Sequence, residues 1–422
     1  MFRFILYLMI GIIISFYFFP IGFTFLPSSI NTKMLLALMG IVFLVYECIK
    51  KESVILNRKL VMPIAIAAVF SLICAISTDI NNTRDYSYAN YIFSFLVWIS
   101  GAYAVCVAMK WVHGEASFRL LTYYLAGICF SQCILALLIN NIPAFQIFVD
   151  SIVSQGQEFF QEVDRLYGIG AALDSAGVRF SLVLVMIVAL LNNDQFTRSN
   201  SVAIILLLLS FFTIAVIGNA ISRTTIIGLG CAVAYFLFSS GLLSLFIKRE
   251  SVKLGVWFGG FMLLAVFISV YMYNYSHDFN KLMRFAFEGF FNWVEKGEWT
   301  TSSTQKLSRE MWIWPEDQST WLIGSGLFDN FVYSTDIGYC RFVLYCGLIG
   351  FSVFAILFVY LGAFFLFEVY EYRLMFFIFI VLTFVIWLKV ATDIFFIYAL
   401  FFCLDSFVEK TPKPKLVDEN RL

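Results

Sequence analysis

The chain has 422 residues, of which 61% are hydrophobic and 13% are charged, and its formal net charge at pH 7 is zero. This composition excludes a water-soluble globular protein, because a soluble fold cannot hide so much apolar surface. Apolar runs long enough to cross a bilayer as a helix recur along the chain, and the alternating pattern of a membrane β-barrel is absent. We therefore expect an all-α polytopic integral membrane protein, with residues 1–422 forming a single membrane domain.

About twelve transmembrane helices are predicted, and the first is expected to be an uncleaved anchor because no small-residue cleavage site follows it. The two predicted spans nearest the C-terminus are short, and the break at Lys389–Asp393 between them is also compatible with one bent hairpin. In chain order, the predicted spans are residues 4–24, 34–48, 60–78, 91–109, 120–140, 174–191, 201–218, 223–246, 254–273, 337–367, 374–390 and 392–406.

Lysine and arginine are unevenly distributed between the two sets of loops. One set carries many, including Lys50, Lys51 and the tail Lys410–Lys415. The short loops of the other set hold only Lys33, Arg84, Arg223 and Lys389. Since positively charged loops stay in the cytoplasm, we expect both termini to be cytoplasmic.

With this orientation, two long loops lie outside the cytoplasm, at residues 141–173 and 274–336. Each contains a stretch with apolar residues at helical spacing and a polar opposite face, Pro143–Val163 and His277–Lys296. Such amphipathic helices typically lie on a membrane surface. Five of the nine tryptophans are in the second loop, where they indicate either an interfacial aromatic belt or a platform for stacking sugars.

Motifs for metals, nucleotides and nucleophilic catalysis are absent from the sequence. The nine cysteines form no CxxC pair and mostly lie in apolar runs, so we expect them to fill the core. Only two histidines are present, which argues against a histidine-ligated metal. The sequence therefore predicts no cofactor, and no nucleic-acid partner.

Three of the predicted helices that enter the membrane from outside carry an arginine near their first turns: Arg179, Arg223 and Arg341. A cation is unfavourable there, because helix N-termini carry partial positive charge. The arrangement becomes favourable if an anion such as a lipid phosphate or diphosphate binds. Alternatively, these side chains extend towards the membrane surface or pair with loop carboxylates.

Four stretches resemble segments of the O-antigen polymerase and ligase superfamily of bacterial membrane glycan enzymes. They occur in the family's order and on one side of the membrane. Ser222–Thr225 is similar to an "SRT" motif at the start of a span, and Arg165–Gly177 to the segment that closes the first long outer loop. Trp321–Asn330 is similar to an "I-G-x-G" turn, and Ser334–Gly350 to the "D-x-G-Y" segment that begins a late span.

The resemblance implies a glycosyltransferase of the bacterial inner membrane, of the O-antigen polymerase (Wzy) type. Such an enzyme transfers a growing surface polysaccharide from undecaprenyl diphosphate onto a new lipid-linked repeat unit at the periplasmic face. Its partners would be the undecaprenyl-diphosphate-linked donor and acceptor, membrane lipids and a membrane protein that regulates chain length. No metal or other cofactor is implied.

The residues fit the chemistry that the resemblance implies, in which the glycosyl diphosphate lipid is already activated. Catalysis then needs cations that stabilise the departing diphosphate and a base that deprotonates the sugar hydroxyl. We expect Asp336 to be the base, with Asp174 and Glu310 as further candidates, although Asp336 could instead only cap its helix. The cationic candidates are Arg165, Arg179 and Arg223, followed by Arg284, Arg309 and Arg341, and Ser222 is expected to contact substrate.

Two other functions are compatible with this sequence. A ligase that transfers glycan to lipid A-core would need a histidine shortly after the G-x-G turn, where this chain has Ser334, Thr335 and Asp336. A transporter or flippase of lipid-linked sugars usually has ionisable residues and broken helices near mid-membrane, in two related halves. Here the ionisable residues gather at the predicted outer rim, which favours the polymerase.

Overall fold

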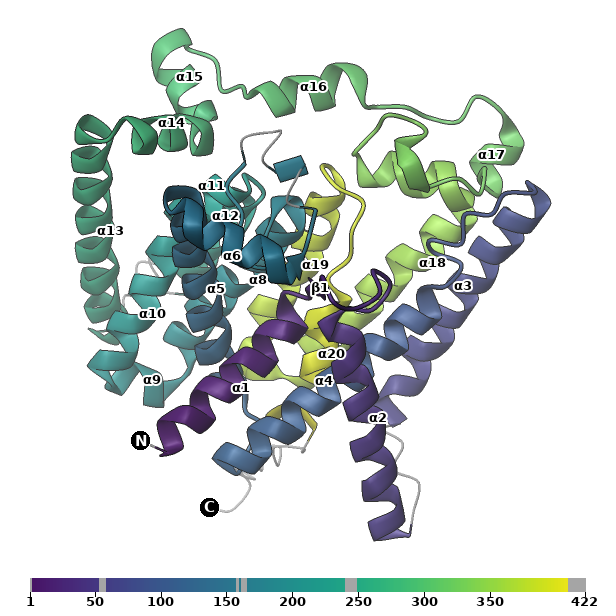
Figure 1. Cartoon of the computed structure of the whole chain (residues 1–422), viewed down its shortest axis with the longest axis horizontal. Coiled ribbons are helices and arrows are strands. Elements are labelled where there is room, and N and C mark those ends of the chain that lie inside the picture. The colour runs from purple at the N-terminus through teal and green to yellow at the C-terminus, as the bar shows by residue number, and fades with distance from the viewer. Residues whose placement is uncertain (1, 53–57, 157–158, 161–164, 240–248, 409–422) are drawn as a thin grey trace, which may run out of the picture.

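The computed structural model describes residues 2–52, 58–156, 159–160, 165–239 and 249–408, and is built almost entirely of helices (Figure 1). Nine helices within these ranges are long and apolar enough to cross a membrane. Two shorter apolar helices, Arg3–Phe18 and Thr225–Ser239, and the nine-residue α20 (Phe395–Cys403) occupy the remaining predicted spans. The predicted all-α polytopic membrane protein is confirmed, while the number of about twelve spans stays a prediction.

The elements of the first half of the chain are α1 (Phe2–Phe18), β1 (Gly22–Phe23), α2 (Thr32–Lys51), η1 (Arg58–Leu60), α3 (Val61–Ile80), α4 (Tyr91–His113), α5 (Phe118–Asn141), α6 (Pro143–Ile152), β2 (Val153–Ser154), α8 (Leu173–Asn193), α9 (Gln195–Ser199) and α10 (Ser201–Thr213). The second half contains η2 (Ile214–Gly218), α11 (Asn219–Ile221), α12 (Thr225–Ser239), α13 (Arg249–Tyr275), α14 (His277–Ala286), α15 (Glu288–Lys296), α16 (Ser302–Glu310), α17 (Gln318–Leu322), η4 (Asp329–Phe331), α18 (Gly338–Glu368), η5 (Tyr370–Tyr372), α19 (Arg373–Trp387), α20 and α21 (Asp405–Val408).

The first helix is shorter than the predicted span of residues 4–24. It ends at Phe18 because Pro20 follows, and proline has no backbone N–H to continue the helical hydrogen bonds. The chain then forms β1, which pairs antiparallel with β2 so that Gly22 lies opposite Ser154. This small sheet, which the sequence pattern does not predict, joins the end of α1 to the first long outer loop.

Helix α8 lies at the centre of the core. All of its side chains from Leu182 to Leu191 are fully buried, and α5, α12 and α19 pack around it. Its contact with α12 is close, because a Cβ on Gly228 would lie 2.1 Å from the Cα of Ser181. Small residues that allow such close approach are typical of packed transmembrane helices. The N-terminal end of α8 is thereby held beside the start of α12.

A break divides α18 at Gly347, which has φ 64° and ψ −178°. The break leaves backbone carbonyls without helical partners, and these must be satisfied where no water is present. The amide of Ser325 donates to Leu344 O at 2.7 Å, and the amide of Gly326 donates to Tyr345 O at 3.0 Å. The G-x-G turn therefore closes the end of the first half of α18.

The second predicted outer loop lies across one end of the helical bundle. Figure 1 shows α14, α15, α16 and α17 crossing the upper end in this view, whereas α1 begins at the opposite end. The second predicted amphipathic stretch is helical, as the pair α14 and α15, whereas the first is helical over Pro143–Ile152 (α6) and then forms the strand β2 at Val153–Ser154. Residues 157–158 and 161–163 of the first stretch, 240–246 of the eighth predicted span and the tail Lys410–Lys415 lie outside the described residues.

Candidate functional site

A polar cavity of about 510 Å³ lies between the bundle and the segment that crosses its end. Segments distant in sequence meet there: the loop before α8, the first turn of α8, the turn before α12, the helices α14 and α16, and the loops beside α18 and α19. The cavity is lined by Arg165, Asp174, Arg223, Phe285, Ser302, Ser303, Lys306, Leu307, Met311, Asp336 and Lys389. Four cations and two carboxylates therefore share one cavity.

Arg223 joins the bundle to the helices above it. Its Nε donates to Phe285 O at 3.1 Å, and one terminal nitrogen lies 2.6 Å from Glu288 Oε2. The Arg223 and Glu288 side chains are 14% and 25% exposed, respectively. Burial lowers the pKa of Arg223, and the Glu288 carboxylate opposes that shift. This guanidinium is consequently a largely buried cation with one carboxylate partner.

Two guanidinium groups, those of Arg223 and Arg165, lie beside the aromatic ring of Phe285. Arg223 and Arg165 lie 4.0 and 4.9 Å, respectively, from the ring centre of Phe285. The ring attracts both cations, which otherwise repel each other. Within the described ranges, neither Arg165 nor Lys306, another cation of the cavity, has a carboxylate partner. The cavity thus offers positive charge that is not neutralised by an ion pair.

The Ser-Arg-Thr turn before α12 divides its side chains between two sides. Ser222 Oγ donates to Asp174 Oδ1 at 3.2 Å, and Thr224 Oγ1 donates to the same oxygen. Lys389 Nζ donates to this carboxylate oxygen at 2.8 Å and lies 2.7 Å from Thr224 Oγ1. Asp174 therefore fixes the turn through its neighbours, while Arg223 between them extends towards α14 and α15.

Asp336 is a carboxylate without a hydrogen bond or an ion pair among the described residues, and its side chain is exposed to the cavity. The surrounding protein raises the pKa of Asp336 by reducing its contact with water, and the charge of Asp174 raises it further. Its own helix does not use it, since the residue before α18 is Ile337 and no side chain caps that helix. The alternative that Asp336 caps its helix is therefore wrong in this structure.

Its neighbour Thr335 holds the segment in place. Thr335 Oγ1 donates to Met311 O at 2.6 Å and accepts from the amide of Ile337 at 3.2 Å. Thr335 is buried, whereas Asp336 is not. The backbone on either side of Asp336 is thus fixed while its carboxylate stays accessible.

Two of the predicted arginines lie outside the cavity. The Nε of Arg179 donates to Phe18 O, and its guanidinium lies 4.6 Å from the ring centre of Phe396. Arg341 donates to Phe328 O at 2.7 Å and covers the ring of that residue. Although both lie near the beginning of a helix, Arg179 in α8 and Arg341 in α18, the structure does not bring them together with Arg223.

Four further sequence candidates do not line the cavity: Arg284, Arg309, Glu310 and Ser222. Arg284 pairs with Glu295 at 2.9 Å, and both side chains are about half exposed. Arg309 and Glu310 are exposed on α16. Ser222 is buried beneath Arg223 and contacts Asp174.

Two lysines of the cavity were not among the sequence candidates, Lys306 and Lys389. Lys389, like Arg223, belongs to one of the short loops that the sequence predicts to lie outside the cytoplasm, where lysine and arginine are disfavoured. That unusual position is a signal by which the sequence alone could have identified Lys389 as a site residue. Lys306 belongs to a long polar loop where no such signal exists.

Comparisons with protein-family models, with curated proteins and with solved structures found no match for this chain. The fold and cavity define a polytopic membrane protein with a cationic site at one end of its helical bundle. Within the described ranges, no group of three or more histidine, cysteine, aspartate or glutamate side chains is placed to hold a metal ion.

Proposed function

We propose that this protein is a glycosyltransferase that polymerises lipid-linked oligosaccharide repeat units. It transfers the growing glycan from undecaprenyl diphosphate onto a repeat unit carried by a second undecaprenyl diphosphate. The observation that carries the proposal is the cavity in which Arg165, Arg223 and Lys306 lie around space beside Asp336, a carboxylate with no partner in the described part of the chain. The resemblance of four stretches to the O-antigen polymerase and ligase superfamily supports the same reaction.

In the proposed reaction, a hydroxyl oxygen of the acceptor sugar attacks the anomeric carbon of the donor glycan. The bond between that carbon and the diphosphate oxygen breaks, and its electron pair leaves with undecaprenyl diphosphate. Asp336 accepts the proton of the attacking hydroxyl. Its raised pKa makes it a better proton acceptor than an ordinary aspartate.

The cations act on the leaving group. Negative charge accumulates on the diphosphate as the glycosidic bond breaks, and fixed cations in a site with little water stabilise that charge. Arg223 is held by Phe285, Glu288 and Ser303, so its guanidinium is already positioned in the cavity before substrate arrives. Among the described residues, Arg165 and Lys306 form no ion pair, so their charge is available to the leaving group.

The sequence makes Asp174 a further candidate for the base, but its contacts in the structure favour a different role. Its ion pair with Lys389 and its hydrogen bonds from Ser222 and Thr224 occupy the carboxylate. A carboxylate held by three donors is a poor proton acceptor, because those contacts stabilise its charged form. We propose that Asp174 positions the turn that carries Arg223.

Neither histidine supports the ligase alternative. His113 contacts Tyr124 OH at 2.8 Å near the end of α4, and His277 begins α14 without lining the cavity. The break in α18 is a feature that transporters share. However, its freed carbonyls are bonded to Ser325 and Gly326, and neither these residues nor Gly347 line the cavity. We therefore retain polymerisation, at the periplasmic face of the inner membrane with both termini in the cytoplasm.

Reconstitution in liposomes with purified undecaprenyl-diphosphate-linked repeat units tests the proposal. We expect a ladder of products that grows by whole repeat units without ATP or a nucleotide sugar. Transport of repeat units across the liposome membrane without any new glycosidic bond would contradict it. Transfer of glycan to lipid A-core but not to a lipid-linked repeat unit would establish the ligase instead.

A further inference from the structure

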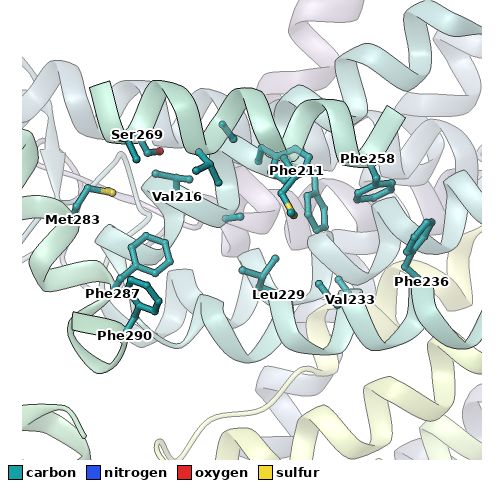
Figure 2. Close-up of a pocket in the computed structure, with 18 of the residues that line it drawn as sticks. Phe211, Val216, Leu229, Val233, Phe236, Phe258, Ser269, Met283, Phe287 and Phe290 are labelled. Carbon is teal, nitrogen blue, oxygen red and sulfur yellow. The ribbon is translucent and has the colours of Figure 1, made fainter. Parts of the chain in front are cut away.

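A second, much larger cavity lies beside the cationic one. It is an apolar groove of about 870 Å³ between α12 and α13, with α10 and η2 at its base. Figure 2 shows Leu229 and Val233 of α12 facing it from one side and Phe258 of α13 from the other. We name this space, lined along α13 from Gly255 to Tyr273, the α12–α13 groove.

The groove has two distinct ends. At one end, the rings of Phe236 and Phe258 lie 4.8 Å apart and narrow it. At the other end, Met283, Phe287 and Phe290 of the α14–α15 segment line it. The groove therefore runs along the membrane-spanning helices and ends beneath the helices that border the cationic cavity.

A single turn of chain separates the two cavities. Phe285 lines the cationic cavity, while Met283 and Phe287 on either side of it line the groove. Arg223 Nε donates to Phe285 O at 3.1 Å, and Asn219 Nδ2 donates to Ala286 O at 2.6 Å. These two bonds fix the turn against the segment that joins η2 to α12, and the cationic cavity and the groove therefore keep a fixed position relative to each other.

We propose that the α12–α13 groove holds the isoprenoid chain of the lipid whose diphosphate group binds at Arg223. This inference rests on the proposed function, since it assigns the hydrocarbon part of the same substrate. A lipid with an anionic head group and a long apolar chain matches this arrangement, because the cations lie on one side of Phe285 and the apolar α12–α13 groove lies on the other. From Gly255 to Tyr273 the lined part of α13 is about 27 Å long, close to the thickness of the hydrocarbon core.

The groove is accessible from the bilayer. Little of α13 is buried, and Met262, which lines the groove, is 54% exposed. A lipid chain can therefore enter sideways, without passing through the bundle. Bilayer chains are as apolar as this lining, so the groove by itself adds little affinity over bulk lipid. Occupancy by the substrate chain must then depend on the head group, and hence on Arg223.

Photocrosslinking in nanodiscs of phosphatidylethanolamine and phosphatidylglycerol tests this dependence. The probe is tritiated undecaprenyl diphosphate without sugar, and p-benzoylphenylalanine replaces Met262. Its neighbour Leu263 is 69% exposed but does not line the groove, so the same replacement at Leu263 is the matched control. We expect labelling at Met262 that falls at least about tenfold when Arg223 is changed to alanine, and little labelling at Leu263.

Equal labelling at both positions, or labelling at Met262 that ignores Arg223→Ala, would show that ordinary bilayer lipid fills the groove and would overturn the proposal. Since the probe carries no sugar, this result is independent of polymerisation. Labelling that depends on Arg223 supports the groove even if the reconstituted protein makes no polymer. Polymer formation without such labelling supports the enzyme and rejects the groove.

A pair of glycines provides a second test. Gly259 lines the groove and Gly260 does not, and a Cβ at either position would meet no atom within 4 Å. Both Gly259→Phe and Gly260→Phe are therefore expected to fold. Because a phenylalanine ring at Gly259 would occupy the space that the chain attached to the bound head group must enter, Gly259→Phe should weaken undecaprenyl diphosphate binding, and Gly260→Phe should leave it unchanged. Equal effects of the two variants would contradict the proposal.

Discussion

Lys389 Nζ and Asp174 Oδ1 lie 2.8 Å apart, although the two residues are separated by 215 positions in the chain. The contact joins the loop between α19 and α20 to the first turn of α8 and, through Thr224, to the turn that carries Arg223. The position of Arg223 thus depends on a residue from near the C-terminal end of the bundle.

Replacing Lys389 by methionine should therefore destabilise the protein by about 1–3 kcal/mol, because the partly buried carboxylate of Asp174 loses its cation. The double variant Lys389→Met with Asp174→Asn should recover part of the loss. Thermal unfolding in detergent, followed by loss of soluble protein, measures both. Additive losses in the double variant would show that the two residues act independently.

Asp336→Asn should lower polymer formation about a hundredfold or more, since it removes the proton acceptor but not the side-chain volume. The variant should also unfold at a higher temperature than the native protein. The reason is that the pKa of Asp336 is raised in the folded state, so its ionised form opposes folding at neutral pH.

The same shift predicts a pH dependence. Activity of the native protein should fall as the pH drops through the raised pKa of Asp336, at a higher pH than for an ordinary aspartate. The residual activity of Asp336→Asn should lack that acidic decline. Polymer formed per enzyme between pH 4 and 8 is the measurement, with Asp317→Asn on the exposed outer loop as control. Near-normal turnover by Asp336→Asn would remove it from the mechanism.

Arg223→Ala should abolish or sharply shorten the polymer, and Arg223→Lys should restore it only in part, because lysine keeps the charge but loses the planar fork. Arg284→Ala removes the same charge from α14, next to Phe285, which Arg223 contacts. The Arg284 pair with Glu295 does not line the cavity and is about half exposed, so we expect near-normal polymer. Glycan length on gels, normalised to protein level, tests both, and normal polymer from Arg223→Ala would make Arg223 a structural anchor.

Gly347→Ala should destabilise the protein severely. Its positive φ disfavours alanine, and a Cβ would lie 2.2 Å from Leu322 O, a backbone atom that cannot move away cheaply. Gly230→Ala is the control, because this helical glycine has open space around it and alanine favours helix by about 1 kcal/mol. Expression and thermal unfolding of the two variants should diverge, and similar behaviour would mean that the break in α18 is not required.

Reporter fusions test the orientation that the lysine and arginine distribution predicts. Fusions after Lys253 and after Arg421 should report the cytoplasm, and a fusion near Thr304, beside the cavity, should report the periplasm. A cytoplasmic signal near Thr304 would place the cavity on the side where the activated lipid is made rather than polymerised. The proposed reaction would then be untenable.

The sequence predicts the helices well because bilayer-spanning runs depend only on local hydropathy. It predicts the site less completely. Arg179, Arg223 and Arg341 share one local pattern, a cation where a helix begins, but only Arg223 reaches the cavity. Position along a helix does not determine which neighbour a long side chain meets, and this depends on distant residues such as Phe18 and Phe328.

Asp336 and Asp174 illustrate the same limit. Both are carboxylates near the start of an inward-running helix, and the sequence ranks them without knowing their neighbours. Only tertiary packing brings Lys389 and Thr224 to Asp174 and leaves Asp336 without a partner in the described part of the chain. Lys306 lines the cavity because α16 lies over the bundle, and no local sequence pattern predicts that position of α16.

If a diphosphate binds at Arg223 as proposed, the ion pair between Arg223 and Glu288 couples that binding to α15 and α16. Glu288 also accepts hydrogen bonds from the amide and hydroxyl of Ser302, at 2.9 and 3.2 Å, so one carboxylate ties the beginnings of α15 and α16 to Arg223. A diphosphate that binds this arginine competes with Glu288 for it. By thermodynamic reciprocity, whatever loosens α15 and α16 must then strengthen diphosphate binding, and diphosphate binding must loosen those helices to the same degree.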